Sequence, residues 1–293
     1  MSSRPDRSPE LVSSAGLALL AFALNSILCR AALGTEAIDA TPFTWLRLSA
    51  GAGFLALVVR WRNQTDVVPR TTLGTIAPWW GALALTVYAA AFSFAYLRLA
   101  AGTGALVLFA VTQVTMIGWG VGRGDRPTAT EWVGVAVALG GLVALTAPGR
   151  TAPDHLGVLL MAVAGVGWGA YSLLGRRALD PVAANAAAFL RAAILATGLL
   201  LLPSLGHAVG RRGALLAIAS GALASGLGYC LWYRALPHLS RTRAAAVQLA
   251  VPVITATLGV LFLDETVTPR LLASGTVILG GVGLVLVGRV PAR

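Results

Sequence analysis

Long apolar segments recur along the whole 293-residue chain, and they constrain its fold more than any other feature. A bilayer core about 30 Å thick needs about 20 apolar residues to span it as a helix. Breaks marked by charged, proline or glycine residues divide this chain into ten segments of about that length. The segments are 12–29, 41–59, 74–97, 101–122, 129–147, 155–175, 182–203, 213–236, 241–263 and 271–288. The sequence therefore predicts an all-α membrane protein of ten transmembrane helices.

The composition indicates that the outer surface of the protein faces lipid. Hydrophobic residues make up 57% of the chain and charged residues 11%, whereas a soluble domain carries about 25% charged residues because its surface faces water. The formal charge of +11 would raise the question of nucleic-acid binding in a soluble protein. Here, however, the arginines are scattered between apolar runs and form no basic face. We expect the partner to be a lipid bilayer and not a nucleic acid.

The distribution of arginines predicts the orientation. If the N-terminus is cytoplasmic, 14 arginines lie in inside segments and 6 in outside segments. The positive-inside rule therefore places both termini on the cytoplasmic side. We expect the membrane to be the inner membrane of a bacterium. Arg47 and Arg191 lie within spans. Either could meet a substrate carboxylate, but we expect them to reach toward the interface or to pair with backbone carbonyls at a helix end.

The chain contains an internal repeat of five spans. Three short motifs of the first half recur in the second, in the same order and at nearly constant separation. The matched pairs are 26–33 with 172–179, Leu46-Arg47 with Leu190-Arg191, and 139–141 with 279–281. Because five is odd, the second copy enters the membrane from the opposite side, so repeats 1–149 and 150–293 are inverted. Inverted repeats are typical of secondary transporters, which bind substrate near the bilayer midplane between the repeats.

These motifs resemble a known family. The arginine in the second helix of each half, and the run 264–269 followed by Gly275 and Gly280-Gly281, are similar to the drug/metabolite transporter superfamily in its EamA-type, ten-helix branch. Residues 167–172 and Tyr88 resemble YddG-type aromatic amino-acid exporters within that branch. The resemblance implies transport of a small metabolite. The first half departs from it, because residues 124–126 stand where the second half has Asp264-Glu265, so the two halves need not contribute equally to the site.

The predicted midplane carries no carboxylate or imidazole. All 11 acidic residues and all 3 histidines lie in predicted loops or in the terminal turns of spans. A carboxylate within the membrane is the usual handle for proton or sodium coupling, so the sequence favours facilitated diffusion or exchange. No Ser/His/Asp, HExxH or paired-carboxylate arrangement can be assembled in the bilayer. We expect no enzyme activity, no metal and no cofactor.

The candidate substrate-binding residues are therefore uncharged. A neutral amide in lipid seeks a partner helix or faces a water-filled cavity, and aromatic walls stack against a planar or apolar side chain. The candidates are Asn25, Tyr88, Phe92, Gln113, Trp168, Tyr171, Tyr229 and Gln248. Gln113 and Gln248 occupy nearly equivalent places in the repeat, so we expect both to face a central cavity. The alternatives are that the amides only tie helices together and that the aromatic rings only pack in the core or face lipid.

Two features predict where the structure flexes. Pro252 within the ninth span frees a carbonyl one turn earlier, and residues 221–228, including Gly226, are rich in glycine.

We expect a monomeric carrier that exports amino acids, aromatic or hydrophobic, or related small metabolites by alternating access. The alternatives are a multidrug or nucleotide-sugar-like carrier, a membrane-bound acyl- or glycosyl-transferase, and a receptor or assembly subunit without transport.

Overall fold

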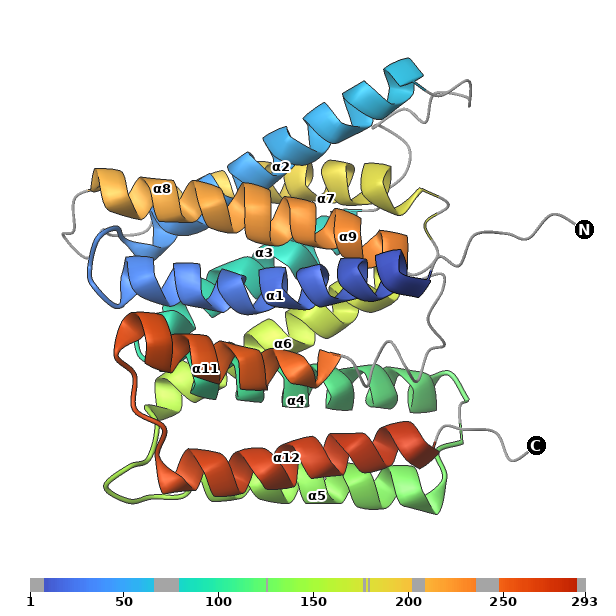
Figure 1. The fold of residues 1–293 in the computed structure, drawn as a ribbon, viewed down its shortest axis with the longest axis vertical. Coiled ribbons are helices and arrows are strands. Elements are labelled where there is room, and N and C mark those ends of the chain that lie inside the picture. The colour runs from blue at the N-terminus through green and yellow to red at the C-terminus, as the bar shows by residue number, and fades with distance from the viewer. Residues whose placement is uncertain are drawn as a thin grey trace, which may run out of the picture.

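A computed structural model describes residues 8–65, 79–124, 126–175, 178, 180–201, 209–235 and 248–288. These residues form helices joined by short connections (Figure 1). The helices are α1 (Ser8–Leu33), α2 (Ala40–Thr65), α3 (Trp79–Tyr96), α4 (Ala101–Gly122), α5 (Ala129–Thr146), α6 (His155–Gly175), α7 (Pro181–Ala196), α8 (Arg211–Ala219), α9 (Gly228–Ala235), α11 (Ala250–Leu263) and α12 (Pro269–Gly288). A 3-10 helix, η1 (Thr197–Leu201), extends α7, and a π-helix, η2 (Ser220–Leu227), joins α8 to α9.

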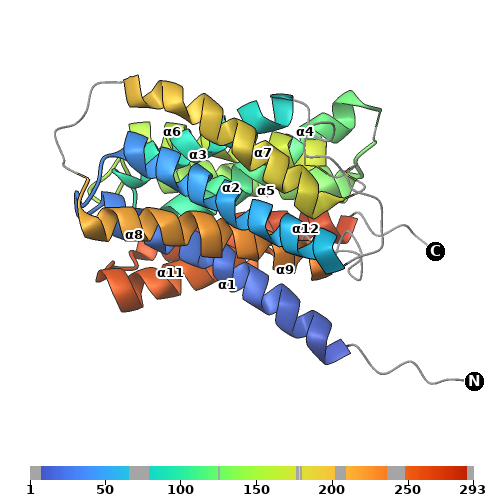
Figure 2. The ribbon, with the colours of Figure 1, turned by 90° about the horizontal axis from the view of Figure 1, so that it is seen from above.

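The helices match the predicted spans. Within the described residues, nine helices are long and apolar enough to cross a membrane, counting α7 with η1 and α8 with η2 and α9. The expected span 241–263 is described from residue 248 onward, where α11 supplies a shorter apolar helix. The start of α1 and the end of α12 lie at the same end of the bundle (Figures 1 and 2). The prediction of an all-α, multi-pass membrane protein is confirmed.

Side-chain caps fix several helix starts. Asp180 accepts hydrogen bonds from the backbone N–H groups of Val182 and Ala183 at the start of α7. Thr128 and Glu131 form a capping box at α5, and Thr268 Oγ1 accepts from the backbone N of Leu271 at α12. These bonds satisfy donors that have no partner within the helix. The connections are therefore defined where polar residues interrupt the apolar pattern.

The outer surface is apolar. Large hydrophobic side chains on several helices are about two-thirds exposed, among them Leu57 of α2 (68%), Phe262 of α11 (68%) and Val287 of α12 (67%). Exposed apolar area on this scale is unfavourable in water but suits contact with lipid. The surface therefore agrees with a bilayer as the surrounding medium.

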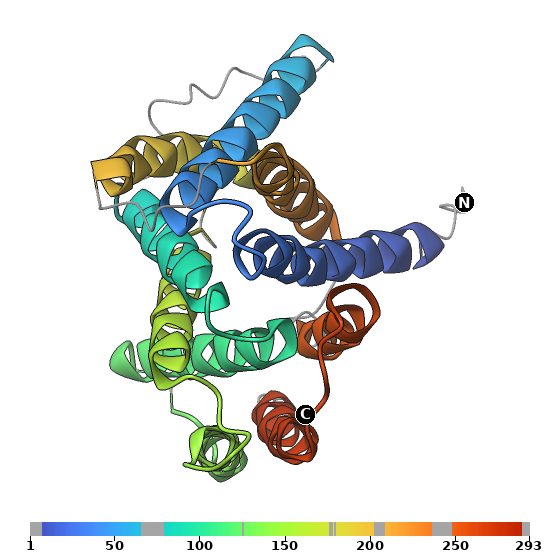
Figure 3. The same ribbon diagram turned by 90° about the vertical axis from the view of Figure 1, so that its left-hand side faces the viewer.

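Close helix packing depends on small residues. α5 and α12 pair along one side of the bundle (Figures 1 and 3). A Cβ atom added at Gly134 of α5 would come 2.6 Å from the carbonyl oxygen of Gly281 of α12, and one added at Gly141 would come 2.8 Å from Ile278. Small residues let helix backbones approach where lipid gives no hydrophobic driving force for association. The second glycine of each Gly-Gly pair thus packs this interface, whereas Gly140 and Gly280 meet nothing within 4 Å.

Candidate functional site

A central cavity lies between helices from both halves of the chain. α1, α3 and α4 contribute from the first half, and α6, η2, α9 and Gln248 from the second. Its lining residues are Phe22, Asn25, Ser26, Tyr88, Phe92, Leu108, Phe109, Trp168, Ala224, Ser225, Tyr229 and Gln248. The centres of water-sized molecules can occupy about 20 Å³ of it, which is room for about one water molecule. A larger occupant requires the surrounding helices to move apart.

Trp168 of α6 is the centre of the aromatic wall. Its ring centroid lies 5.1 Å from that of Tyr88 on α3 and 5.4 Å from that of Tyr229 on α9. Phe22 of α1 lies 6.4 Å away in an edge-on arrangement. α6 approaches α3 closely here, because a Cβ atom at Gly167 would lie 2.9 Å from the backbone N of Tyr88. The flanking glycine therefore lets the indole ring meet its neighbours, and four helices each contribute a ring to one wall.

A polar cluster adjoins this wall. Asn25 donates through Nδ2 to the Tyr88 hydroxyl at 3.3 Å and accepts from Ser220 Oγ at 2.6 Å. The cluster joins α1, α3 and η2. Ser225, also on η2, lines the cavity and is buried, but its hydroxyl has no hydrogen-bond partner among the described residues. The cavity thus combines aromatic rings with a few placed polar groups, as small-molecule sites do.

Arg47 is buried behind the same wall, and the expectation that it reaches the interface is wrong. The residue is 2% exposed. Its Nη2 donates to the Tyr88 hydroxyl at 3.1 Å, and its guanidinium carbon lies 5.2 Å from the Tyr88 ring centroid and 4.9 Å from that of Phe92. The side chain points into the bundle because α3 and η2 pack against this part of α2. Arg191 differs: it is half-buried, with its guanidinium 5.6 Å from the ring of the exposed Trp79.

A second cavity lies near the end of α1 and the α3–α4 connection. The centres of water-sized molecules can occupy about 440 Å³ of it, and its lining includes Arg30, Thr103 and Glu265. On α1, Ser26 lines the central cavity and Arg30, one turn later, lines this second cavity. We call the second one the outer cavity, after the orientation that the distribution of arginines predicts.

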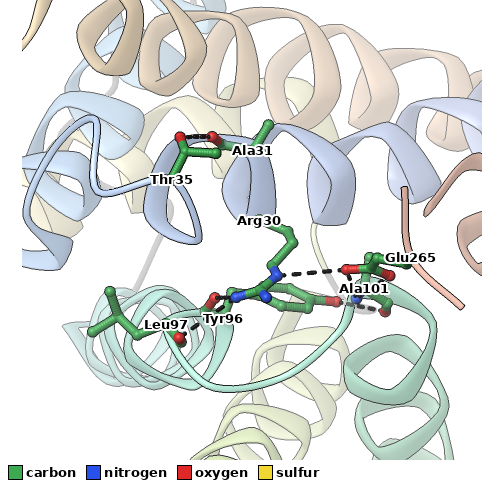
Figure 4. A network of polar contacts seen from close by, with 7 residues as sticks. All are labelled: Arg30, Ala31, Thr35, Tyr96, Leu97, Ala101 and Glu265. Atoms are coloured by element: carbon green, nitrogen blue, oxygen red, sulfur yellow. Dashed lines mark hydrogen bonds and ion pairs between the residues drawn. The ribbon is translucent and has the colours of Figure 1, made fainter. Parts of the chain in front are cut away.

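Arg30 and Glu265, which line the outer cavity, belong to a polar network (Figure 4). Arg30 Nε lies 3.5 Å from Glu265 Oε1, and Arg30 Nη1 donates to the Tyr96 carbonyl at 2.9 Å. Both carboxylate oxygens of Glu265 accept from the backbone N of Ala101 at 2.9 Å. The Tyr96 hydroxyl donates to the Ala101 carbonyl at 3.2 Å. The network joins α1, the α3–α4 connection and the segment after α11.

Comparison with known proteins gives the family. The model of the EamA-like transporter family matches residues 155–287. An uncharacterized protein of Pseudomonas aeruginosa is 48% identical over 97% of this chain and 96% of its own length. The uncharacterized transporter YwfM of Bacillus subtilis is 28% identical over 49% of this chain and 50% of its own, and an uncharacterized transporter of Archaeoglobus fulgidus is 25% identical over 68% and 73%.

The chain belongs to the EamA-like transporter family. It is therefore a multi-pass membrane transporter. A solved crystal structure with 22% sequence identity superposes with a TM-score of 0.65, covering 94% of this chain and 97% of that one, and shows the same fold. The predicted resemblance to EamA-type transporters is confirmed.

The structure of this EamA-like transporter brings six of the eight predicted substrate-binding residues to the central cavity. They are Asn25, Tyr88, Phe92, Trp168, Tyr229 and Gln248. Tyr171 lies behind the wall, 5.9 Å from Trp168, and donates to Asn185 of α7. Gln113 is buried in α4 but is not among the lining residues, so of the two glutamines only Gln248 fits the expectation.

The predicted hinge residues lie in irregular parts of the transporter. Gly226 lies within η2, and π-helical segments frequently occur at functional sites. A Cβ atom at Gly226 would come 2.6 Å from the Phe54 ring of α2. Pro252 lies near the start of α11, which begins at Ala250, and Gln248 just before it is also helical. Proline is tolerated in the first turn because the N–H groups there lack helical partners.

The predicted substrate-binding residues did not include Arg47, Ser220 or Ser225, although the sequence left open that Arg47 meets a substrate carboxylate. A cation in the middle of an apolar span is itself a signal of function, and Arg47 carried it. Nothing in the sequence distinguishes the serines of η2 from those that only bond to their own helix, as Ser93 Oγ does with the Ala89 carbonyl.

Proposed function

We propose that this transporter is an inner-membrane exporter of amino acids with aromatic or hydrophobic side chains, or of related small metabolites. The observation that carries the proposal is the cavity in which Trp168, Tyr88 and Tyr229 form one wall beside the Asn25 cluster. Aromatic rings favour a planar or apolar side chain through stacking and edge contacts. The placed hydroxyl and amide groups suit the polar end of the same molecule.

The proposal includes two inverted repeats, 1–149 and 150–293. Helix packing supports it. When each helix of a contacting pair is replaced by its equivalent in the other repeat, the result is again an observed contact. The contact of α1 with α9 corresponds to that of α6 with α3, and the contact of α1 with α11 corresponds to that of α6 with α4. The pairs α5–α12, α2–α7 and α4–α11 correspond to themselves. A pseudo-two-fold axis between the repeats would account for both sets of contacts.

Alternating access is the proposed mechanism. Arg30 and Glu265 hold the outer end together beside the outer cavity. The helices around the central cavity must separate to admit a substrate, and η2 together with Pro252 is the proposed flexing element. Because the described carboxylates lie at helix ends, we propose facilitated diffusion or exchange by a monomer, with both termini cytoplasmic and with a substrate range like that of YddG-type exporters.

The uncharged lining of the central cavity, with one buried cation behind it, favours an amino acid over the substrates of the alternative functions. A nucleotide-sugar site needs several cations near the phosphates, and among the described residues only Arg47 lies behind the cavity wall. A lipophilic cation, the usual multidrug substrate, would be repelled by Arg47. A transferase would need a catalytic carboxylate or histidine beside its substrate, and the described lining of the central cavity includes neither. The outer cavity does contain Glu265, but that carboxylate is already bound by Arg30 and by the backbone N of Ala101.

Counterflow in proteoliposomes tests the proposal. Vesicles preloaded with unlabelled phenylalanine should accumulate external radiolabelled phenylalanine faster than protein-free vesicles, and tryptophan or leucine should compete. Aspartate and lysine should compete poorly, because their charged side chains would have to contact the aromatic wall. If none of the standard amino acids exchanges faster than in protein-free vesicles, the amino-acid assignment is wrong.

A further inference from the structure

The geometry points to Arg47 as the receptor for a carboxylate on the transported molecule. In the present conformation the Tyr88 hydroxyl occupies one arm of its guanidinium. The inference rests on the proposed function and deepens it, because it makes one carboxylate a requirement for recognition. The ligand class is a small monocarboxylate with an aromatic or apolar body.

Arg47 is buried with unused donors. Its Nε and Nη1 atoms have no hydrogen-bond partner among the residues that the structure describes, and the residue is 2% exposed. A charge removed from water without a partner is costly, and ionisable groups within membrane spans usually mark a functional site for that reason. Contacts with the faces of Tyr88 and Phe92 offset part of this cost. These contacts do not supply hydrogen-bond acceptors for the remaining N–H groups of the guanidinium.

No carboxylate of the described chain fills it. Ion pairs among the described residues join Arg30 with Glu265, Arg62 with Asp180 and Arg98 with Asp154. All of these carboxylates lie at helix ends, whereas Arg47 lies two turns inside α2. The negative charge that would complement Arg47 must therefore come from outside the described structure, and the cavity next to it is where a ligand arrives.

The cavity is one side chain away from Arg47. Tyr88 lines the cavity and its hydroxyl accepts from both Arg47 and Asn25. A small rotation of Tyr88 would expose the guanidinium, whose planar fork matches a carboxylate with two parallel hydrogen bonds. The unpartnered Ser225 hydroxyl and Gln248 face the same space and remain for the rest of the ligand. Tyr88 is thus the shield of an anion site in the substrate-free protein.

The single charge and the aromatic wall set the ligand class. One guanidinium balances one carboxylate, whereas a phosphate ester or a nucleotide carries more charge than Arg47 can neutralise. Inorganic anions would gain nothing from Trp168 and Tyr229. A carboxylate attached to an aromatic body would use both parts of the site at once.

Matched acid and amide ligands test the inference on the purified full-length chain in detergent. The probes are 3-phenylpropanoate with 3-phenylpropanamide, and L-phenylalanine with L-phenylalaninamide, since each pair differs only at the carboxylate. Binding is followed by quenching of tryptophan fluorescence and by thermal stabilisation. We expect each acid to bind at least about tenfold more tightly than its amide, because charge-assisted bonds are roughly twice as strong as neutral ones.

Variants locate the effect. Arg47→Gln should remove the preference for the acids, and Arg47→Lys, which keeps the charge and loses the fork, should retain only part of it. Arg191→Gln is the matched control, because Arg191 occupies the equivalent place in the repeat and lies at the exposed Trp79; its acid preference should equal that of the unmodified protein. The comparison of acid with amide in the unmodified protein needs no variant, so a folding defect in Arg47→Gln does not prevent the test.

The outcomes separate this inference from the proposed function. Equal binding of acids and amides, no binding of either acid, or an unchanged preference in Arg47→Gln overturns the role of Arg47, whatever the counterflow assay shows. Arg47-dependent binding of the acids without amino-acid counterflow supports the carboxylate site and rejects amino-acid export. Amino-acid counterflow without acid preference does the reverse.

Discussion

Arg30 and Glu265 meet at 3.5 Å where the end of α1 faces the segment after α11, and their pairing joins the two halves of the chain (Figure 4). Glu265 also accepts from the backbone N of Ala101 at the start of α4, where the helix dipole favours a negative charge. One carboxylate thus fastens three segments beside the outer cavity.

We expect Glu265→Gln to open the outer end more often. The change removes the charge but keeps the size of the side chain, and the lost attraction is about 1 kcal/mol for a partly exposed pair. In a Cys29→Ala, Cys230→Ala background carrying Ser225→Cys, modification by a membrane-impermeant thiol reagent from outside should become about fivefold faster. Asp154→Asn removes the more exposed pair with Arg98 and should leave the rate unchanged. An equal rate with and without Glu265→Gln would show that the Arg30–Glu265 pair does not hold the outer end closed.

Trp168→Ala should change the substrate profile. Trp168 contacts the rings of Tyr88, Tyr229 and Tyr171, and each aromatic contact of this kind contributes about 1 kcal/mol. Removing the ring should weaken competition by tryptophan and phenylalanine about tenfold and that by leucine less. Trp132→Ala, on the exposed side of α5, is the control. A uniform loss for all substrates would indicate a structural role only.

Gly221→Ala should destabilise the protein. A Cβ atom at Gly221 would overlap the carbonyl oxygen of Arg47, so η2 and α2 would have to separate. Forcing atoms into a packed interface costs about 1–3 kcal/mol. Gly53→Ala on α2 meets nothing within 4 Å and should be neutral or slightly stabilising, because alanine favours the helix. Thermal unfolding in detergent compares the two, and equal stabilities would refute the close approach.

The Arg62–Asp180 pair should make stability depend on pH in the acid range. Burial raises the pKa of the Asp180 carboxyl, but hydrogen bonds from Arg62 and from the backbone N–H groups of Val182 and Ala183 outweigh it and hold that pKa below its usual 3.8. Because the folded pKa is the lower one, the contribution is present above pH 3.8 and is lost as the pH falls through the folded pKa.

Asp180→Asn isolates this contribution, since asparagine caps a helix as well as aspartate does. At neutral pH the variant should be less stable by about 1 kcal/mol at most, and the difference should disappear at the lowest pH. A difference that stays constant with pH would assign it to the cap and not to the charge. The measurement is thermal unfolding in detergent over a series of pH values.

The two arginines of the Leu-Arg motif show how far the sequence could be interpreted. Arg47 and Arg191 occupy equivalent places in the repeat and looked alike. The structure buries Arg47 against Tyr88 and Phe92 and leaves Arg191 beside the exposed Trp79. Gln113 and Gln248 diverge in the same way, since only Gln248 lines the cavity. The equivalence of the motifs predicted which helix carries each residue but not which residues surround it.

By itself the sequence determined that the described residues form membrane-length helices and, to within several residues, where most of these helices begin and end. Bilayer thickness fixes how long an apolar segment must be, and backbone hydrogen bonding in lipid requires that it be helical. It also indicated that the carboxylates lie at helix ends. Only the tertiary structure decided which face of each helix points inward. A helix in lipid is apolar on its inner and outer sides alike, so no amphipathic pattern marks the direction of the cavity or the place of Arg47 behind its wall.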